Sequence, residues 1–230
     1  MNKKSFWLIN IFLVVIICSV FTFSLVLPVV KDEEVYTNAP VYNGSSDTNV
    51  SLMVNVYWGT EYIDTMLNIF YEEDVKTTFF VGGTWVEKNP DVLKKIYEFG
   101  HEIGNHGYFH KDHKLLNEKR NKEEIVSCHN IVKAVIGIDM TLFAPPSGSF
   151  NANTLDIASN LGYNTIMWSK DTIDWRDKNQ QLIVKRATEN VVGGDLILMH
   201  PTKDTVDGLR TIITTLKQKG LTITPVSNVI

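Results

Sequence analysis

The sequence predicts an α/β fold, either a (β/α) barrel or a doubly wound parallel sheet. Between residues 51 and 230, short runs rich in β-branched and aromatic residues alternate with segments of helical periodicity, which is typical of a parallel sheet covered by helices. Gly100, Gly162 and Gly220 each separate a helical segment from the next β-rich run, where a left-handed residue often ends a helix. In such folds, ligands gather at the carboxyl ends of the strands.

The expected elements follow from these two kinds of segment. Strands are expected at 52–57, 77–81, 101–105, 142–144, 165–168, 196–199 and 221–225. Helices are expected at 62–73, 90–99, 118–136, 153–161, 180–191 and 206–219. The span that contains them, 51–230, has 180 residues, an ordinary size for one domain.

The first 30 residues differ from the rest in composition. They hold 21 hydrophobic residues, and no charged residue occurs from Phe6 to Leu27, a run long enough to cross a ~30 Å hydrocarbon core as a helix. Lys3 and Lys4 precede this run, and mostly acidic residues follow it. The excess of basic residues on the N-terminal side places that end in the cytoplasm.

The chain is therefore expected to contain four segments. They are a cytoplasmic N-terminus at 1–5, a transmembrane signal-anchor at 6–30, an extracellular tether at 31–50 and a folded domain at 51–230. This arrangement describes a single-pass protein of the cell membrane whose domain lies outside. The alternative is a cleaved signal peptide and a secreted domain, but the usual small-residue cleavage pattern is missing.

Charge and cysteine content exclude several classes of protein. The chain has 22 basic and 26 acidic residues, a net charge of −4, and residues 31–230 alone carry 20 and 26, a net charge of −6. Such a domain is not expected to bind nucleic acid or an anionic lipid surface. Cys128 is the single cysteine after residue 30, so the domain has no internal disulfide, and we expect this thiol to be buried.

Candidate site residues follow the predicted strands. His106 and His110 are four residues apart, so both could bind one cation if the segment were helical. His200 follows another strand, and Asp174 lies in a loop that follows a third. Each has a simpler interpretation. His106 and His110 could be exposed histidines of a helix, His200 could be a hydrogen-bonded histidine, and Asp174 could be a turn or capping residue. Their common position after successive strands favours a site.

Several motifs occur together and in a fixed order. They are Thr77-Thr78-Phe79-Phe80-Val81, Gly100-His101-Glu102-Ile103-Gly104-Asn105-His106 followed by His110, Asp171-Thr172-Ile173-Asp174-Trp175, and Gly194-Asp195-Leu196-Ile197-Leu198-Met199-His200. In these motifs, residues 51–230 resemble the polysaccharide deacetylase family, the NodB-homology carbohydrate esterases. The resemblance implies a distorted (β/α) barrel of the NodB type. It also implies hydrolysis of N- or O-acetyl groups on a polymeric sugar with a divalent cation, usually Zn²⁺ or Co²⁺.

The resemblance also implies roles for individual residues. His106 and His110 occupy the positions of the two histidine ligands, and His200 that of the acid that protonates the leaving amine. Asp174 occupies the position of the carboxylate that orients this acid. In such a site the cation lowers the pKa of its bound water and polarises the acetyl carbonyl, while a protonated imidazole assists departure of the amine.

Two motifs depart from the family pattern. The family's first motif reads Thr-Phe-Asp-Asp-Gly, but this chain has Asn55-Val56-Tyr57-Trp58-Gly59. Tyr57 therefore stands in the position of the base, and Trp58 in that of the aspartate ligand. Ala144 replaces the arginine that begins the third motif. A tyrosine, whose unperturbed pKa is near 10, is a poor base at neutral pH unless a metal lowers it.

The altered motifs leave a third metal ligand to be found. Glu61 is the first candidate, and the alternatives are Asp64, Asp112 and His113. We expect substrate contacts from residues of the same loops, namely Trp58, Tyr108, Pro146, Ser147 and Trp175.

Two functions remain in consideration. The first is a membrane-anchored deacetylase-like hydrolase acting on peptidoglycan or another N-acetylated glycan, with Tyr57 as a rebuilt base. The second is a catalytically impaired glycan-binding or scaffold protein, in which aromatic side chains, Phe109 among them, stack on sugar rings.

Overall fold

The structure is a computed structural model that describes residue 7, residues 12–16 and residues 39–230. The chain divides into two compact units, residues 1–35 and 36–230. Within the described ranges, no helix combines the length and apolar character needed to cross a membrane. The predicted N-terminus at 1–5 lies outside these ranges, as does most of the predicted anchor at 6–30. Both stay predictions.

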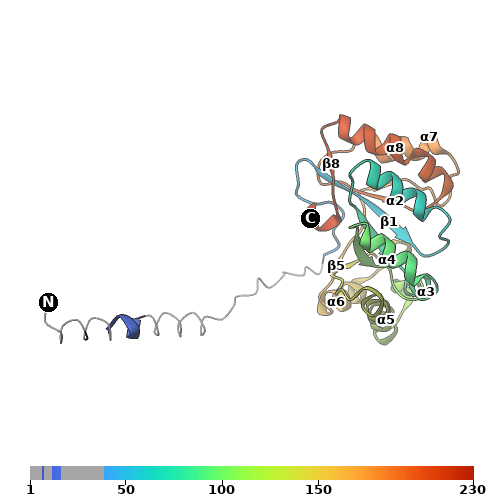
Figure 1. Cartoon of the computed structure of the whole chain (residues 1–230). Coiled ribbons are helices and arrows are strands. Elements are labelled where there is room, and N and C mark those ends of the chain that lie inside the picture. Colours follow the sequence, from blue (N-terminus) through green and yellow to red (C-terminus); the bar gives the residue numbers. More distant parts are fainter. Residues whose placement is uncertain (1–6, 8–11, 17–38) are drawn as a thin grey trace. The chain divides into compact units, whose positions relative to one another are not determined.

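The second unit is built on one curled parallel sheet (Figure 1). Its strands are β1 (Asn49–Val56), β2 (Thr78–Val81), β3 (Glu102–Asn105), β4 (Leu142–Phe143), β5 (Asn164–Thr165), β6 (Lys170–Asp171), β7 (Leu196–Met199) and β8 (Thr222–Ile223). The strand order is β5-β4-β3-β2-β1-β7-β6, with β8 paired to β1, and every one of these pairings is parallel. The distorted barrel expected from the sequence is thus a curled half-barrel whose path ends at β5 and β6.

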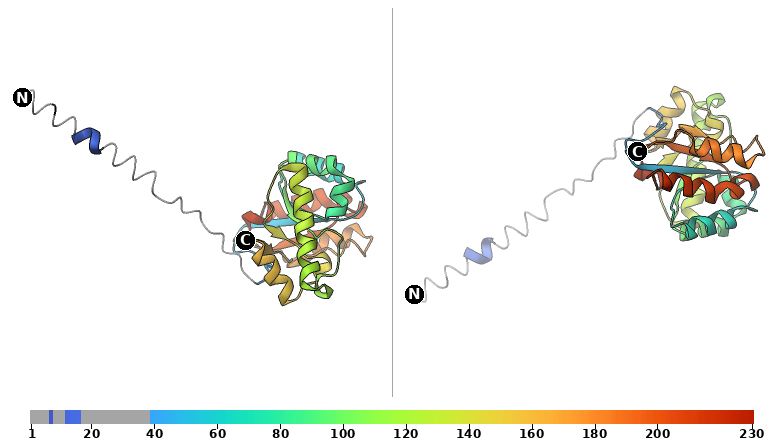
Figure 2. Two further views of the ribbon diagram at one scale, coloured as in Figure 1. Left: turned by 90° about the horizontal axis from the view of Figure 1, so that it is seen from below. Right: turned by 90° about the horizontal axis from the view of Figure 1, so that it is seen from above.

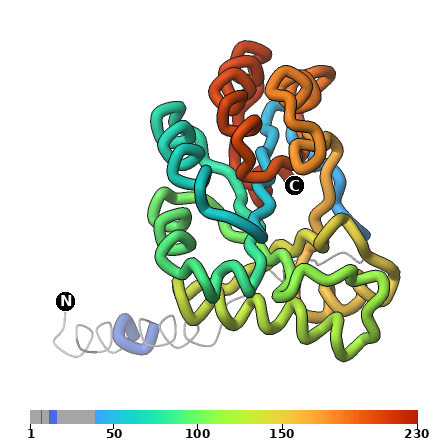
Figure 3. Tube along the Cα trace, turned by 90° about the vertical axis from the view of Figure 1, so that its right-hand side faces the viewer, coloured from blue at the N-terminus to red at the C-terminus, as the bar shows by residue number. Residues whose placement is uncertain are grey.

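Helices cover the convex side of this sheet, and Figure 3 shows them at the periphery with the strands inside. They are α2 (Ile63–Glu72), α3 (Gly83–Lys88), α4 (Pro90–Glu98), α5 (Glu118–Ile136), α6 (Ala152–Asn160), α7 (Gln180–Thr188) and α8 (Lys203–Gln218). α7 and α8 pack side by side, and α5, the long helix in the left view of Figure 2, packs against α3, α4 and α6. Parallel strands joined through helices place all their carboxyl ends at one edge of the sheet.

Most predicted elements are confirmed, and the differences have local causes. The helix at 118–136 and the strand at 196–199 have the predicted bounds, whereas α3 and β6 were not predicted. α3 has only six residues and begins at a glycine, so it has too little periodicity to be recognised. The strand predicted at 165–168 ends at Thr165, because Ile166 makes only an isolated bridge, to Val41.

Helix ends follow the chemistry of their flanking residues. α8 begins three residues before its predicted start, because the Thr202 hydroxyl accepts a hydrogen bond from Thr205 N and caps the helix. Gly100, Gly162 and Gly220 all have positive φ, at 82°, 79° and 78°, so the predicted left-handed helix ends are confirmed. These glycines let the chain reverse directly into the next strand.

The folded unit extends further toward the N-terminus than the predicted boundary at residue 51. Val41 N donates to Thr165 O at 2.8 Å, and Gly44 N donates to Gly194 O at 2.8 Å. A Cβ on Gly44 would lie 1.9 Å from Val229 O, so only glycine allows this approach. The end of the predicted tether therefore packs as part of the domain.

Two apolar clusters hold the sheet. The larger one lies between the sheet and its helices, and alternate residues of β1, Leu52, Val54 and Val56, belong to it. The intervening Met53 belongs to a second cluster, with Phe80 of the neighbouring strand. This alternation follows from the two-residue period of a strand. Cys128 is buried in the larger cluster, as predicted, and burial raises the pKa of its thiol to about 12.

Candidate active-site cleft

His200 and Asp174 form the most firmly held pair at the carboxyl edge of the sheet. His200 directly follows β7, and its Nδ1 lies 2.7 Å from Asp174 Oδ1. Asp174 Oδ2 also accepts hydrogen bonds from His200 N at 2.6 Å and from the Thr205 hydroxyl at 2.5 Å. The carboxylate side chain is fully buried. It therefore fixes the imidazole and leaves Nε2 directed away from the pair, as the sequence predicts for an oriented acid.

His106 and His110 lie together, but not on a helix. Their ring centroids are 5.0 Å apart with an interplanar angle of 70°. The segment between them is a bend, and His110 itself has a left-handed φ of 53°. His106 Nδ1 donates to Ala144 O at 2.7 Å, which leaves Nε2 as an acceptor. Burial lowers the pKa of both imidazoles, that of His106 well below its ordinary value.

The histidine loop, residues 106–110, is held by residues that were not predicted from the sequence. Glu124 of α5 is buried, and its Oε2 accepts from Tyr108 N at 2.9 Å and from Phe109 N at 2.7 Å. Asn105 Oδ1 accepts from Gly107 N at 2.9 Å. A buried carboxylate that accepts backbone N–H groups fixes a loop firmly. The signal was a glutamate at a position of α5 that helical periodicity assigns to the core, next to Ile125 and four residues before Cys128.

Tyr57 occupies the position predicted for the base, but its hydroxyl is engaged elsewhere. The ring stacks on His110, with centroids 4.4 Å apart, and the hydroxyl donates to Phe109 O at 3.3 Å. A phenol that donates its proton to a carbonyl is not placed to abstract a proton from water. The geometry therefore does not support Tyr57 as the base.

Trp58 lies directly over the predicted acid. Its indole stacks on the His200 imidazole, with centroids 5.3 Å apart and an interplanar angle of 21°. The next residue, Gly59, has a left-handed φ of 63°, and its carbonyl accepts from Trp85 Nε1 at 2.7 Å. This bend directs Trp58 into the cleft with 46% of its surface exposed.

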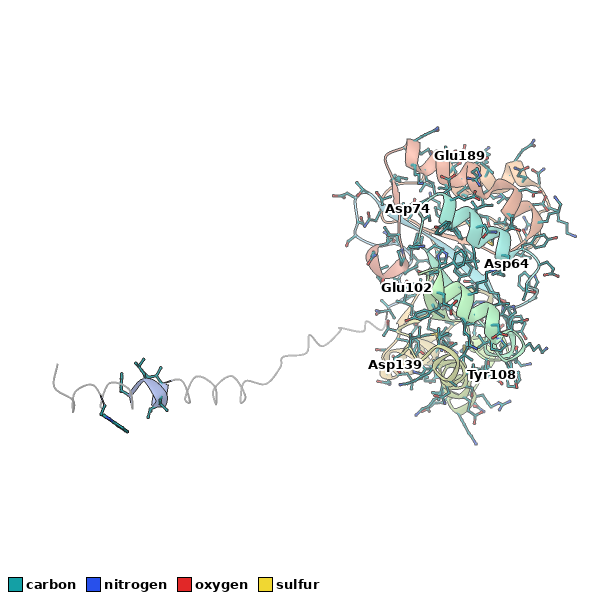
Figure 4. The ribbon with its side chains drawn as sticks, in the orientation of Figure 1. Asp64, Asp74, Glu102, Tyr108, Asp139 and Glu189 are labelled. Carbon is teal, nitrogen blue, oxygen red and sulfur yellow. The ribbon has the colours of Figure 1, made fainter. Side chains whose placement is uncertain are left out.

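The acidic side chains proposed as third metal ligand are engaged in contacts elsewhere. Glu61 Oε2 accepts from Thr60 N at 2.9 Å. Asp64 pairs with Lys95 at 2.8 Å on the helical surface (Figure 4). Asp112 accepts from Lys114 N at 3.2 Å. Glu61 and Asp112 bond to backbone N–H groups of neighbouring residues and Asp64 to a lysine of α4, so the expectation that Glu61 joins the two histidines is not supported.

His113, the remaining alternative, is buried with Nδ1 2.5 Å from Asn121 Oδ1. Among the described residues, no group of three or more His, Cys, Asp or Glu side chains is arranged to hold a metal ion. His106 and His110 supply two nitrogen donors without a carboxylate, so this donor set does not fit the three-ligand site expected for Zn²⁺.

A cavity of about 430 Å³ opens beside the histidines. It is lined by Asn55, Trp58, His106, His110, Ser147, Trp168, Asp171, Trp175, Leu198 and His200. The predicted contacts Trp58, Ser147 and Trp175 are thus brought together. Asn55 was missed, although the two-residue alternation along β1 turns it to the same side as Met53.

Two other predicted substrate contacts lie away from this cavity. Tyr108 bonds to Glu87 through its hydroxyl at 3.1 Å and packs beside Gly83 of α3 (Figure 4). It was expected at the cleft because it neighbours the histidines in sequence, but the bend at Gly107 turns it outward. Pro146 is buried near Gly107 and does not line the cavity.

The fold and this cleft define a carbohydrate esterase of the NodB type with an altered first motif. Residues 43–166 match the family model for polysaccharide deacetylases. The chain belongs to the polysaccharide deacetylase family, as its motifs predict.

Similar curated proteins include an uncharacterized protein and a deacetylase. An uncharacterized protein of Bacillus subtilis, YlxY, is 41% identical over 79% of this chain and 57% of its own length. A peptidoglycan-N-acetylglucosamine deacetylase of Bacillus cereus is 33% identical over 70% of this chain and 60% of its own length. The chain thus spans about three fifths of these curated relatives.

A solved structure is also similar. It is a CE4 family pseudoenzyme of Bacillus anthracis, with a TM-score of 0.81 and 36% identity over 84% of this chain and 69% of that one. A mutant of that pseudoenzyme with restored enzymatic activity has a TM-score of 0.82 and 34% identity, over 84% of this chain and 71% of that one.

Proposed function

We propose that this chain binds an amino-sugar polysaccharide of the cell wall, such as peptidoglycan, and does not carry out the family's deacetylation. The observation that carries the proposal is the placement of Tyr57 and Trp58. They stand where the family has its two aspartates, and they stack on His110 and His200. The two carboxylates of the family reaction are thus replaced by two rings that cover the imidazoles.

The loss affects both halves of the reaction. The Tyr57 hydroxyl donates to Phe109 O, so the base position holds a proton donor. His106 and His110 provide two donors where a catalytic zinc needs three protein ligands. Without a carboxylate at either position, the site lacks both a third ligand for the cation that binds the nucleophilic water and a base that activates this water.

Binding, by contrast, is well provided for. Trp58 and Trp175 line the cavity and keep 46% and 56% of their surfaces exposed. Large exposed aromatics in a concave site are unusual unless they bind a ligand. Sugar rings present apolar C–H faces that pack on indoles, and Asn55, Ser147 and His200 supply hydrogen-bonding groups at the same cavity.

The similar proteins support this proposal in two ways. The B. cereus relative is named for deacetylation of N-acetylglucosamine in peptidoglycan, which suggests the polymer. The B. anthracis structure is described as a pseudoenzyme, which suggests that a member of this family is retained without its reaction.

A second candidate function is weak metal-dependent hydrolysis, with His200 as general acid. It is favoured by the His200–Asp174 pair, which keeps the geometry of an oriented acid at 2.7 Å. It requires a cation, Zn²⁺ or Co²⁺, to find its remaining ligand outside the described histidine pair.

Acetate release separates the two functions. The full chain, kept in mild detergent, is incubated with N-acetylglucosamine oligomers and Zn²⁺ or Co²⁺. We expect binding without acetate. A double variant, Tyr57→Asp with Trp58→Asp, returns both carboxylates to the first motif, and we expect it to bind zinc more tightly than the parent. Acetate release by the parent chain that is lost in His200→Ala would establish the hydrolase instead.

We also propose that residues 6–30 anchor the protein in the cell membrane with the domain outside. The uncharged run from Phe6 to Leu27 and the preceding Lys3 and Lys4 support this topology. Protease added to intact cells should remove the domain and leave the N-terminal segment in the membrane fraction. Full protection of the domain, or its recovery from the medium without the N-terminal segment, would contradict it.

A further inference from the structure

We propose that the cleft prefers sugars that carry a free, protonated amino group, that is, a glycan from which acetyl groups have already been removed. This inference rests on the proposed function and names the ligand class of the same cleft. A deacetylation reaction carried out by another protein must then supply the ligand.

Asp171 gives the cavity a negative charge. It is the one Asp or Glu among the lining residues that the structure describes. Its Oδ1 accepts from Ile173 N at 2.8 Å, and within the described residues Oδ2 receives no hydrogen bond. The side chain is half-buried, so an ammonium group that enters the cavity can reach an acceptor with little competition from the protein.

The neighbouring cations make their ion pairs with other carboxylates, although Arg176 also lies within the electrostatic reach of Asp171. Lys170 pairs with Asp195, and Arg176 makes two hydrogen bonds to Asp177, at 2.8 and 3.1 Å. The described lining contains no lysine or arginine. Among the described lining residues, Asp171 is thus the carboxylate that an ammonium group in the cavity would meet.

The three indoles of the cavity also favour a cationic amino sugar. Trp58, Trp168 and Trp175 line one cavity, and an indole face attracts a cation through its quadrupole. Trp175 already makes a cation–π contact of this kind, because the Arg176 guanidinium lies 5.9 Å from its ring centroid. A cationic amino sugar can thus place its C–H face on one indole while its ammonium group lies between an indole and Asp171.

His106 adds a hydrogen-bond acceptor to the lining of the cavity. His106 donates through Nδ1 to Ala144 O at 2.7 Å and keeps Nε2 as an acceptor. An amine offers N–H donors to such an acceptor, whereas an acetamido group offers a single N–H and adds a methyl group to accommodate. Charge and hydrogen bonding therefore favour the same ligand.

The test is a calorimetric comparison of two oligosaccharides of equal length. The full chain is titrated at neutral pH with an oligomer of glucosamine and with the corresponding oligomer of N-acetylglucosamine. We expect the glucosamine oligomer to bind about ten-fold more tightly, from one partly exposed ion pair and one cation–π contact. Asp171→Asn retains an oxygen for Ile173 N, so it should remove this preference while binding of the acetylated oligomer persists.

Glu189→Gln is the matched control, because it removes one exposed negative charge at the end of α7 (Figure 4). It should leave the preference unchanged. Equal affinity for the two oligomers, or a preference that survives Asp171→Asn, overturns this inference and leaves glycan binding intact. Failure to bind either oligomer overturns the proposed function and the inference together.

Discussion

The indole of Trp58 stacks on the imidazole of His200, with ring centroids 5.3 Å apart and planes inclined by 21°. Asp174 holds the same imidazole through Nδ1 at 2.7 Å. The position predicted for a metal-binding aspartate thus carries a ring that covers the predicted acid. Trp58 and His200 therefore form part of one aromatic wall of the cleft.

Replacing Trp58 with alanine should weaken glycan binding. The variant removes one stacking surface, and we expect a loss of about 1 kcal/mol, or roughly five-fold in affinity. Calorimetric titration with the preferred oligosaccharide measures it. Tyr97→Ala is the control, since this tyrosine is exposed to a similar extent, 43%, on α4 outside the cavity. Equal losses in the two variants would show that Trp58 is not a binding residue.

Asp174→Asn should destabilise the fold. Asp174 Oδ2 accepts two hydrogen bonds, from His200 N and the Thr205 hydroxyl, and Oδ1 accepts a third from His200 Nδ1. The amide can satisfy only some of these donors, so the free energy of unfolding should fall by about 1–3 kcal/mol. Urea denaturation measures it. Asp91→Asn, exposed on α4, should change it little, and an equally stable Asp174→Asn variant would refute the anchoring role.

Glu124→Gln should loosen the histidine loop. Glu124 accepts from Tyr108 N and Phe109 N with one buried oxygen, and a neutral amide is a weaker acceptor than a carboxylate. We expect faster hydrogen exchange at these two amides and a loss of about 1–2 kcal/mol in unfolding free energy. Glu123→Gln changes the adjacent, more exposed glutamate and should leave both amides protected. Unchanged protection in Glu124→Gln would contradict the clamp.

His101 should make stability fall in weak acid. It is buried against Phe70 and Phe79, and burial lowers its pKa from 6.5 to about 4. Between these values the unfolded chain binds a proton that the folded chain does not, so stability is full above about pH 6.5 and declines toward pH 4. The decline from this group is roughly 3 kcal/mol.

Urea denaturation from pH 7 to pH 4.5 tests this sign. His101→Gln can still accept from Thr77 N, the bond that His101 Nδ1 now receives at 3.2 Å, but it does not titrate. Its stability should depend less steeply on pH than that of the parent chain. Identical pH dependence in the two proteins would show that His101 titrates normally.

The sequence predicts the fold, the proximity of His106 to His110 and the contact of His200 with Asp174, because these features rest on local signals. Alternating strand and helix patterns place His106 and His200 after parallel strands, and the carboxyl ends of such strands share one edge. The His200–Asp174 contact follows from that placement together with the family motif. Glu124 escaped prediction because its role depends on which helix packs beneath the loop.

The described residues do not bring Glu61 to His106 and His110, and the reason is geometric. Glu61 is close to the altered motif in sequence, but the left-handed bend at Gly59 lets its carboxylate bond to Thr60 N. Likewise, the position of Tyr57 in the first motif suggested it as a base, whereas its hydroxyl donates to Phe109 O. The sequence does not show which acceptor a side chain reaches, so such assignments need the three-dimensional structure.

We propose above that this cleft binds amino-sugar glycans without deacetylating them. A calorimetric titration of the full chain with a partly N-acetylated glucosamine oligomer, run with zinc and again with a chelator, tests it when the same samples are assayed for acetate. We expect saturable binding of equal affinity in both conditions and no acetate. Acetate release that zinc supports and the chelator abolishes would contradict it, as would the absence of binding.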